Sequence, residues 1–510
     1  MGTDLDYGFA VFRLGLLVGG LALFVWGWRA RRRGEARAER RLRLALLGVL
    51  AATAFGSYFY FWRFARLHVE DTFHYYVGSK YFPELGYYGL YDCTLQALDD
   101  AGRADLAALP HVRNLGTMAL EPPPLALARG PGCKQGFSPE RWREFAADVR
   151  WFHARVPGDR WAHVMEDHGY HPSPVWTLFG RPLASAIPVK GAGTRVLARL
   201  DHALVLGAFL FVGFSVGWET ACFAAIVWGT GFLWRYSWIG DAFLRHLWLA
   251  SSLVGLCRLR RRRHAGAAVF FTTAALLRIF PAVFWIGWAG HALRELVRTR
   301  ALSSATRRFV AASALTAAVL VAASVPVSGR GLGVWPEFAD KISRFAEHGA
   351  VNKMGLGVVA QALERGLAGG GGSGALGAAI QAARLLVVAL GLFGFWRALA
   401  HAEDWEAAAL GMTLVPLLTD PTNYYFSFVL AALLLALRRP RIGVVLFLTC
   451  IAWSANGLIF YRQDVEFVGA SLVALALSFA ILREMTRAED RGRSLVSDRE
   501  PTLRANALGN

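Results

Sequence analysis

Charged side chains are scarce in this sequence. Only 18% of the 510 residues are Asp, Glu, Lys or Arg, whereas 55% are hydrophobic, and the mean hydropathy is +0.36. A soluble protein of this size carries more charge, because its exterior faces water. The composition therefore excludes an ordinary soluble protein and indicates a chain that lies mostly in a lipid bilayer.

Acidic residues are scarcer than basic ones, 37 against 55, which leaves a net charge of +18. Nucleic-acid-binding chains can have this balance, but their basic residues usually form continuous, solvated tails. Here the arginines cluster in short links between apolar runs: "RARRRGEARAERRLR" (29–43), "RLRRRRH" (258–264), "RELVRTRALSSATRR" (294–308) and "RRPR" (438–441). Such links are typical of cytoplasmic loops under the positive-inside rule, so we expect no nucleic-acid partner.

Cysteine is rare, with five residues, and no metal-ligand spacing such as CxxC or HExxH occurs. We therefore expect no bound metal. Three cysteines, Cys222, Cys257 and Cys450, lie in or beside apolar runs and are interpreted as packing residues. Cys93 and Cys133 share one long polar segment, where they form either a disulfide, if the segment faces an oxidising compartment, or two free thiols.

Apolar runs of membrane-spanning length recur along the chain. Because a backbone in lipid must satisfy its own hydrogen bonds, these runs should be helices. We predict an all-α polytopic membrane protein with about 11 to 13 spans of about 20 residues each. In the run "AGAAVFFTTAALLRIFPAVFWIGWAG", Pro281 divides either one kinked helix or two short half-spans. No small-residue cleavage site precedes the first arginine cluster, which favours a span over a signal peptide there.

Placing the basic links in the cytoplasm gives a consistent topology. Residues 1–43 form an extra N-terminal span and a basic link, 44–482 the main transmembrane domain, and 483–510 a charged cytoplasmic tail that we expect to be disordered. Two segments, 63–199 and 327–375, then lie outside. The first includes "SPERWREFAADVRWFHARV", which has the cap and the amphipathic pattern of a helix on the membrane surface.

The stretch "HVEDTFHYYVGSKYFPELGYYGLYDC" (68–93) follows directly on the second apolar run. A helix that begins near Asp71 would place Asp71, His74 and Tyr75 on one face, with Glu70 beside them at its N-terminus. One interpretation is a helix cap within an aromatic belt at the membrane surface. The other is a catalytic site, in which a carboxylate acts as general base on an acceptor hydroxyl.

Cations near the same predicted surface are further candidates. Arg245 and His246, in "IGDAFLRHLW", and Arg278, in "LLRIFP", lie near the external ends of predicted spans. An arginine there can bind a phosphate through its forked donors or can reach the lipid headgroups. His348 and Lys353, in the second external segment, can add donors or remain solvated.

Taken in order, these segments resemble the C-type glycosyltransferases, and most closely family 87, which includes polyprenyl-phosphate-mannose-dependent mannosyltransferases. That family carries an acidic residue, paired tyrosines, two spaced glycines and Leu-Tyr. The stretch above is similar to it through Asp71, Tyr75, Tyr76, Gly78, Gly86, Leu90 and Tyr91. The segments "HPSPVWTLFGRPLA", "AGAAVFFTTAALLRIFPAVF", "HGAVNKMGLGVVAQALERGL" and "DPTNYYFSFVLAALLL" are similar to its later motifs, in the same order.

The chain departs from the family pattern in three ways. It has an extra first span, it has Arg278 where lysine is usual, and it has "IGDAF" where a Gly-Gln pair is frequent. The segment between Leu90 and His171 matches nothing in the family pattern. These departures affect the predicted identity of the acceptor and of the sugar more than they affect the predicted fold.

The resemblance implies a fold, with a large first external loop that carries interfacial helices, and a reaction. A sugar such as mannose would pass from a polyprenyl-phosphate donor to a lipid or glycan acceptor, with inversion and without a cofactor. Asp71 would deprotonate the acceptor hydroxyl, and Glu70 is the second candidate base. The remaining candidates would bind the donor and its departing phosphate: Arg278, Arg245, His246, His348, Lys353, Tyr75, His74 and Asn352. The site would face the periplasmic or external side of a bacterial-type inner membrane.

Three other classes remain as alternatives, one of which is a membrane receptor whose first external loop binds a ligand. A transporter or flippase of lipid-linked glycans often shows repeated halves and charges deep within several spans. This sequence shows no internal repeat, and its polar residues concentrate in the predicted external segments. A glycan polymerase or ligase usually has its largest external loop late in the chain, whereas here it comes early.

Overall fold

A computed structural model describes residues 2–62, 67–102, 109–347, 352–368, 374–461 and 464–487. Within this range the chain is helical apart from turns and one short antiparallel hairpin, β1 (Val112–Arg113) and β2 (Leu120–Glu121). The prediction of an all-α protein is therefore confirmed for the described part of the chain.

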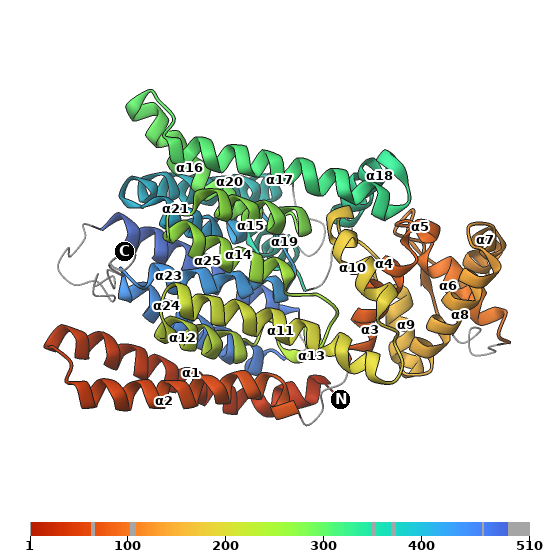
Figure 1. The fold of residues 1–510 in the computed structure, drawn as a ribbon, viewed down its shortest axis with the longest axis horizontal. Coiled ribbons are helices and arrows are strands. Elements are labelled where there is room, and N and C mark those ends of the chain that lie inside the picture. The colour runs from red at the N-terminus through yellow and green to blue at the C-terminus, as the bar shows by residue number, and fades with distance from the viewer. Residues whose placement is uncertain are drawn as a thin grey trace, which may run out of the picture.

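Six helices in the described ranges are long and apolar enough to cross a membrane, and they run side by side in Figure 1. They are α1 (Gly2–Arg33), α11 (Ala192–Ser215), α17 (Ser304–Ser328), α20 (Gly374–Ala398), α24 (Pro440–Ile459) and α25 (Val465–Thr486). The N-terminal helix packs into the same bundle, because Phe24 of α1 contacts Phe447 of α24 with ring centroids 5.9 Å apart. The chain is thus a multi-pass integral membrane protein.

The helix α2 (Arg37–Tyr58), 22 residues long, packs against α1 and α12 at the edge of the bundle (Figure 1). Shorter segments complete the bundle: α12 (Trp218–Gly229), α14 (Leu247–Arg260), α15 (His264–Leu277), α16 (Ala282–Thr299), the series α21 (Asp404–Leu410), η6 (Gly411–Leu414) and α22 (Val415–Leu418), and the pair η7 (Asn423–Leu430) and α23 (Ala431–Leu435). The apolar run at 406–419, one of the runs predicted to span the membrane, is therefore broken into three pieces. Such irregular backbone is tolerated at membrane depth where protein surrounds it, and residues 405–417 are buried throughout.

The turn at Pro281 joins two antiparallel helices. α15 begins at His264, whose ring bonds Asp404 at 2.8 Å. Near the end of α16, Arg294 donates to the carbonyl of Trp396 at 3.0 Å. Since Trp396 and Asp404 lie close together in the chain, both outer ends of the pair lie at the same end of the bundle. Of the two alternatives, the two short half-spans are correct.

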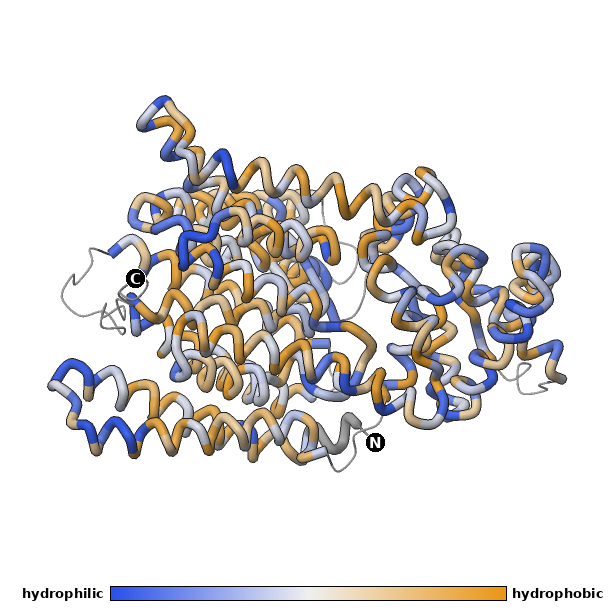
Figure 2. The backbone as a smooth tube through the Cα atoms, viewed as in Figure 1, coloured by the Kyte–Doolittle hydropathy of each residue, from blue (hydrophilic) through white to orange (hydrophobic). Residues whose placement is uncertain are grey.

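The first of the two segments predicted to be external forms a cap of short helices at one end of the bundle (Figure 1). It consists of α3 (Val69–Thr72), the π-helical turn η2 (Phe73–Val77), α4 (Gly78–Lys80), α5 (Phe82–Leu85), α6 (Leu90–Asp99), α7 (Pro123–Gln135), α8 (Pro139–His153), α9 (Gly158–Glu166) and α10 (Pro174–Ala186). Two helices of the second segment predicted to be external, α18 (Val334–Glu347) and α19 (Leu356–Ala368), follow α17. In Figure 2 hydrophilic residues are spread through the cap, whereas hydrophobic ones dominate the bundle.

The amphipathic helix predicted near residue 140 is α8, but its apolar face does not lie on lipid. Ser138 caps it by accepting from the backbone N–H of Arg141 at 3.3 Å. Its apolar side is buried inside the cap, where Phe145 packs on Tyr81 and Phe152 packs on Phe73, with ring centroids 5.2 and 5.6 Å apart. The pattern predicted the helix correctly, but protein covers the face that was expected to meet the membrane.

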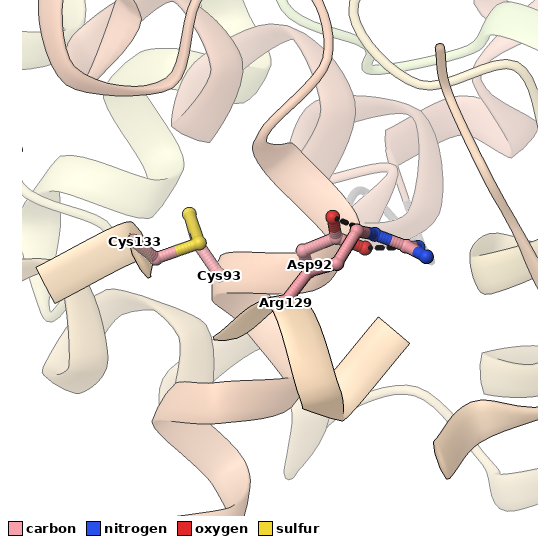
Figure 3. The surroundings of a disulfide bond; sticks show 4 residues. All are labelled: Asp92, Cys93, Arg129 and Cys133. Atoms are coloured by element: carbon pink, nitrogen blue, oxygen red, sulfur yellow. Dashed lines mark hydrogen bonds and ion pairs between the residues drawn. A yellow bond between two sulfur atoms is a disulfide. The ribbon is translucent and has the colours of Figure 1, made fainter. Parts of the chain in front are cut away.

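Cys93 and Cys133 form a disulfide between α6 and α7 (Figure 3), with Cα atoms 5.4 Å apart. Beside it, Arg129 donates to both oxygens of Asp92, at 2.8 and 2.9 Å. Of the two alternatives for these cysteines, the disulfide is the one that the structure contains. The other three, Cys222, Cys257 and Cys450, are free.

Candidate active site at the junction of bundle and cap

The helix expected at Asp71 begins slightly earlier, at Val69. His68 precedes it, and its Nδ1 accepts the backbone N–H of Asp71 at 3.3 Å. After Thr72 the chain widens into the π-helical turn η2. Turns of this kind change which side chains share a face, and they are frequent at functional sites.

Because of this turn, His74 and Tyr75 point to different partners. His74 lies within 2.9 Å of the Tyr91 hydroxyl and 3.2 Å of the carbonyl of Val164 in α9, and both are cap residues. Tyr75 instead reaches the arginines of the bundle. The expectation that Asp71, His74 and Tyr75 act from one face is therefore wrong for His74.

Two arginines converge on Tyr75, and one of them also pairs with Asp71. The Nη2 of Arg245 lies 3.0 Å from Oδ1 of Asp71. Arg245 also donates through Nη1 to the Tyr75 hydroxyl, and Arg278 donates to the same oxygen through Nη2 at 2.9 Å. Residues from α3, from the segment before α14 and from the end of α15 thus meet at one point.

The site is nearly closed to solvent. The side chains of Arg245 and Asp71 are 5% and 13% exposed. Aromatic rings surround the guanidinium groups, with Tyr424 centred 4.8 Å from Arg245 and Tyr425 centred 5.7 Å from Arg278. Cations over aromatic faces are stabilised by the ring quadrupole, most strongly where water is excluded.

Burial, partly offset by the two arginines, raises the pKa of Tyr75 to about 12. The phenol therefore keeps its proton at neutral pH and serves as a neutral anchor for both cations. Its neighbour His171 donates from Nδ1 to the carbonyl of Gly169 at 3.0 Å, which leaves Nε2, at 3.4 Å, to accept from the Tyr75 hydroxyl. Burial and the charge of Arg278 hold the pKa of His171 well below its usual value, which agrees with this neutral tautomer.

One oxygen of Asp71 has no partner. Oδ2 is buried and accepts no hydrogen bond from any residue in the described ranges, while Oδ1 is held by Arg245. A buried carboxylate oxygen without a donor is uncommon in folded proteins and requires a specific explanation. In a site for a hydroxyl-bearing substrate, that oxygen is the one positioned to receive a proton.

The structure separates several predicted site residues from this cluster. Glu70 points to α9, where Arg160 donates to it at 2.7 Å. His246 turns into the bundle, where its Nδ1 bonds Asp201 at 2.7 Å. Asn352, in the residues between α18 and α19, bonds Asn423, the first residue of η7, at 3.1 Å. These three residues have structural partners, and none of them contacts Asp71 or Tyr75.

The remaining candidates lie at the edge of the site or outside the described ranges. The ammonium of Lys353 lies 5.5 Å from the ring centre of Phe345, which itself stacks on His171 with centroids 5.2 Å apart. Lys353 therefore approaches the site through one intervening aromatic ring. His348 lies outside the described residues.

Three residues that surround the cluster were not predicted from the sequence: His171, Tyr424 and Tyr425. They stand in segments quoted for other reasons, His171 before prolines and the tyrosine pair in a turn. No spacing pattern marks them, because they reach the site from two parts of the chain that are far from Asp71.

No group of three or more His, Cys, Asp or Glu side chains suited to hold a metal ion occurs in the part of the chain that the structure describes. The absence of a metal or other cofactor remains a prediction.

No protein-family model, curated protein or solved structure matches this chain. The resemblance to the C-type glycosyltransferases therefore depends on the residues of the sequence motifs alone.

Proposed function

We propose that the protein is a membrane glycosyltransferase that moves a sugar, such as mannose, from a polyprenyl-phosphate donor to a hydroxyl of a lipid or glycan acceptor. The observation that carries this proposal is the arrangement of Asp71, Arg245 and Arg278. A carboxylate with one unpartnered oxygen pairs with the buried Arg245, and the Tyr75 hydroxyl joins Arg245 to a second buried arginine, Arg278. This combination suits proton abstraction next to a departing phosphate.

In the proposed reaction, Oδ2 of Asp71 takes the proton of the acceptor hydroxyl. The resulting oxygen nucleophile attacks the anomeric carbon and forms the new glycosidic bond, while the bond from that carbon to the phosphate oxygen breaks. The phosphate leaves with the electron pair, and the configuration of the sugar inverts. The products are the glycosylated acceptor and polyprenyl phosphate.

The arginines act on the negative charge that develops on the leaving phosphate. Arg278 has no carboxylate within ion-pair distance among the described residues, so its charge is available to an anion. Planar guanidinium groups bind phosphate through paired donors, more specifically than an ammonium does. Tyr75 contributes by holding both guanidinium groups in place before the donor arrives.

Two features support a site on the periplasmic or external face of a bacterial-type inner membrane. The basic α1–α2 and α16–α17 connections lie at the end of the bundle opposite the cap (Figure 1), as the positive-inside rule expects of cytoplasmic loops. The cap contains the Cys93–Cys133 disulfide, and such bonds persist in oxidising compartments. The polyprenyl chain of the donor would remain in the bilayer, with membrane lipids around it.

The test is transfer of label from a panel of radiolabelled polyprenyl-phosphate sugars, in membranes that contain the protein. We expect transfer from at least one donor, and loss of transfer in Asp71→Asn at unchanged protein level. Glu70→Gln is the matched control, because Glu70 bonds Arg160 outside the cluster. Full activity of Asp71→Asn would remove the proposed base, and absence of transfer from every donor would remove the proposed function.

A further inference from the structure

Arg245 stands in an irregular segment, 240–246, between α13 (Tyr236–Ile239) and α14. Two residues of this segment, Asp241 and Leu244, have left-handed backbones with φ of 54° each. A non-glycine residue in this region is strained, and it persists only where the surrounding structure imposes it. The segment is also buried, so solvent does not hold it in place.

Two consecutive residues of α11 grip this segment on either side of Arg245. The carboxylate of Asp201 accepts the backbone N–H of His246 at 3.1 Å and its Nδ1–H at 2.7 Å. Next along the helix, His202 accepts at Nδ1 from Arg199 at 3.3 Å, so its proton is on Nε2. That Nε2–H donates to Asp241 at 2.5 Å.

His68 ties the same segment to the helix of Asp71. Its backbone N–H donates to the carbonyl of Asp241 at 3.1 Å, and its Nε2–H donates to the carbonyl of Ser237 at 3.0 Å. Its Nδ1 accepts the backbone N–H of Asp71 at 3.3 Å. His68 therefore links the backbone of the proposed base to Asp241 of this segment through its own backbone, and to the preceding helix α13 through its imidazole.

We propose that His68, Asp201 and His202 are positioning residues that hold Arg245 opposite Asp71. The ion pair joins a short cap helix to a strained segment in the bundle, and neither element is long enough to fix the distance by itself. Asp201 and His202 bond the arginine segment from α11, and His68 bonds it from the side of the Asp71 helix. The meaning of this arrangement for catalysis rests on the proposed function, but the positioning itself does not.

The first test measures the ion pair without any activity. The unfolding midpoint of the full-length protein in detergent is measured with and without Asp71→Ala, in three backgrounds: wild type, His202→Leu and His264→Leu. His264 is the matched control, because it also bonds an aspartate, Asp404 at 2.8 Å, but does so at the opposite end of the bundle.

In wild type, Asp71→Ala removes the partner of a positioned Arg245 and lowers the midpoint. In the His202→Leu background we expect this shift to fall to less than about half, because residues that share a network are not additive. In the His264→Leu background the shift should be unchanged. An equal shift in all three backgrounds overturns the proposal.

Two further variants keep the test decisive if His202→Leu does not fold. His202→Gln retains an N–H donor and should restore more than about half of the shift. Asp201→Asn keeps one oxygen that accepts a hydrogen bond from His246, but its N–H₂ group now faces the other N–H of His246. It should therefore reduce the Asp71→Ala midpoint shift, as His202→Leu does. A full wild-type shift in Asp201→Asn counts against the proposal.

Sugar transfer provides the second readout. A small displacement of a catalytic group costs a large factor in rate, so we expect kcat/KM in Asp201→Asn to fall by about tenfold or more. His264→Leu should stay within about twofold of wild type, since it lies far from the cluster. If the wild type transfers no sugar, the proposed function fails, whereas the midpoint comparison still decides whether these residues position Arg245.

Discussion

The Asp71–Arg245 ion pair allows the strongest prediction about stability. At a separation of 3.0 Å, two unit charges attract by about 5 kcal/mol at an effective dielectric constant of about 20. The cost of removing both groups from water offsets much of this attraction. Loss of one partner is more expensive, because it leaves the other charge buried and uncompensated, and typically costs about 3 to 5 kcal/mol.

We therefore expect Asp71→Ala and Arg245→Met each to lower the free energy of unfolding by about 3 to 5 kcal/mol. The double variant should cost less than the sum of the two, by up to about 3 kcal/mol, because the second substitution removes the charge that the first one stranded. Glu70→Ala with Arg160→Met is the control cycle. That pair is more exposed, at 27% and 45%, so its coupling should not exceed about 1 kcal/mol.

The assay is thermal unfolding in detergent, followed with a fluorophore that reacts with free thiols. Cys257 and Cys450 are free and buried, so they react when the bundle opens. If the free-energy costs of the Asp71 and Arg245 substitutions add to within about 0.5 kcal/mol, the two residues do not interact and the ion pair is refuted.

Three other predictions follow from single residues. Burial lowers the pKa of Lys341 in α18 to about 7, below its value in the unfolded chain, so stability should rise with pH from about 7 to about 10. Thermal-unfolding midpoints measured across this pH range should rise less in Lys341→Met than in wild type. Substitution of the exposed Lys190 by Met is the control and should leave the rise unchanged. Cys93→Ser opens a disulfide between residues 40 apart and should cost about 4 kcal/mol of stability, whereas Cys222→Ser should cost far less. Arg278→Met removes both the charge and the forked donors, so the KM for the polyprenyl-phosphate donor should rise about tenfold while the KM for the acceptor stays constant; an equal rise in both would contradict a phosphate role.

Hydropathy predicted the helices of the bundle well, because each run needed only its own residues to reveal it. It predicted the broken spans less well. The segment from α21 to α22 has the composition of one span, yet it is three pieces, since buried neighbours allow its backbone to leave the regular helix. For α8 the pattern showed the helix and its apolar face, but a pattern cannot tell whether lipid or protein covers that face.

The candidate site shows the same division. The sequence marked Asp71, Arg245 and Arg278 as candidates because each is a charged residue beside an apolar run. Burial of a charge there costs free energy, so such residues usually have a function. The different partners of Glu70 and His74 were not recognisable, because they depend on the π-helical turn and on the position of α9.

By itself, the sequence determined that this chain lies in a membrane, where its helices begin and end approximately, and which charged residues stand at their ends. These properties depend on residues that are close together in the chain, because the free energy of moving a segment from water into lipid depends on the side chains of that segment. Only the tertiary structure decided that Asp71 meets Arg245, that Arg278 reaches the same cluster through Tyr75, that Cys93 meets Cys133, and that α11 holds the arginine segment. Contacts between residues far apart in the chain depend on how all the helices pack, and no local pattern contains that information.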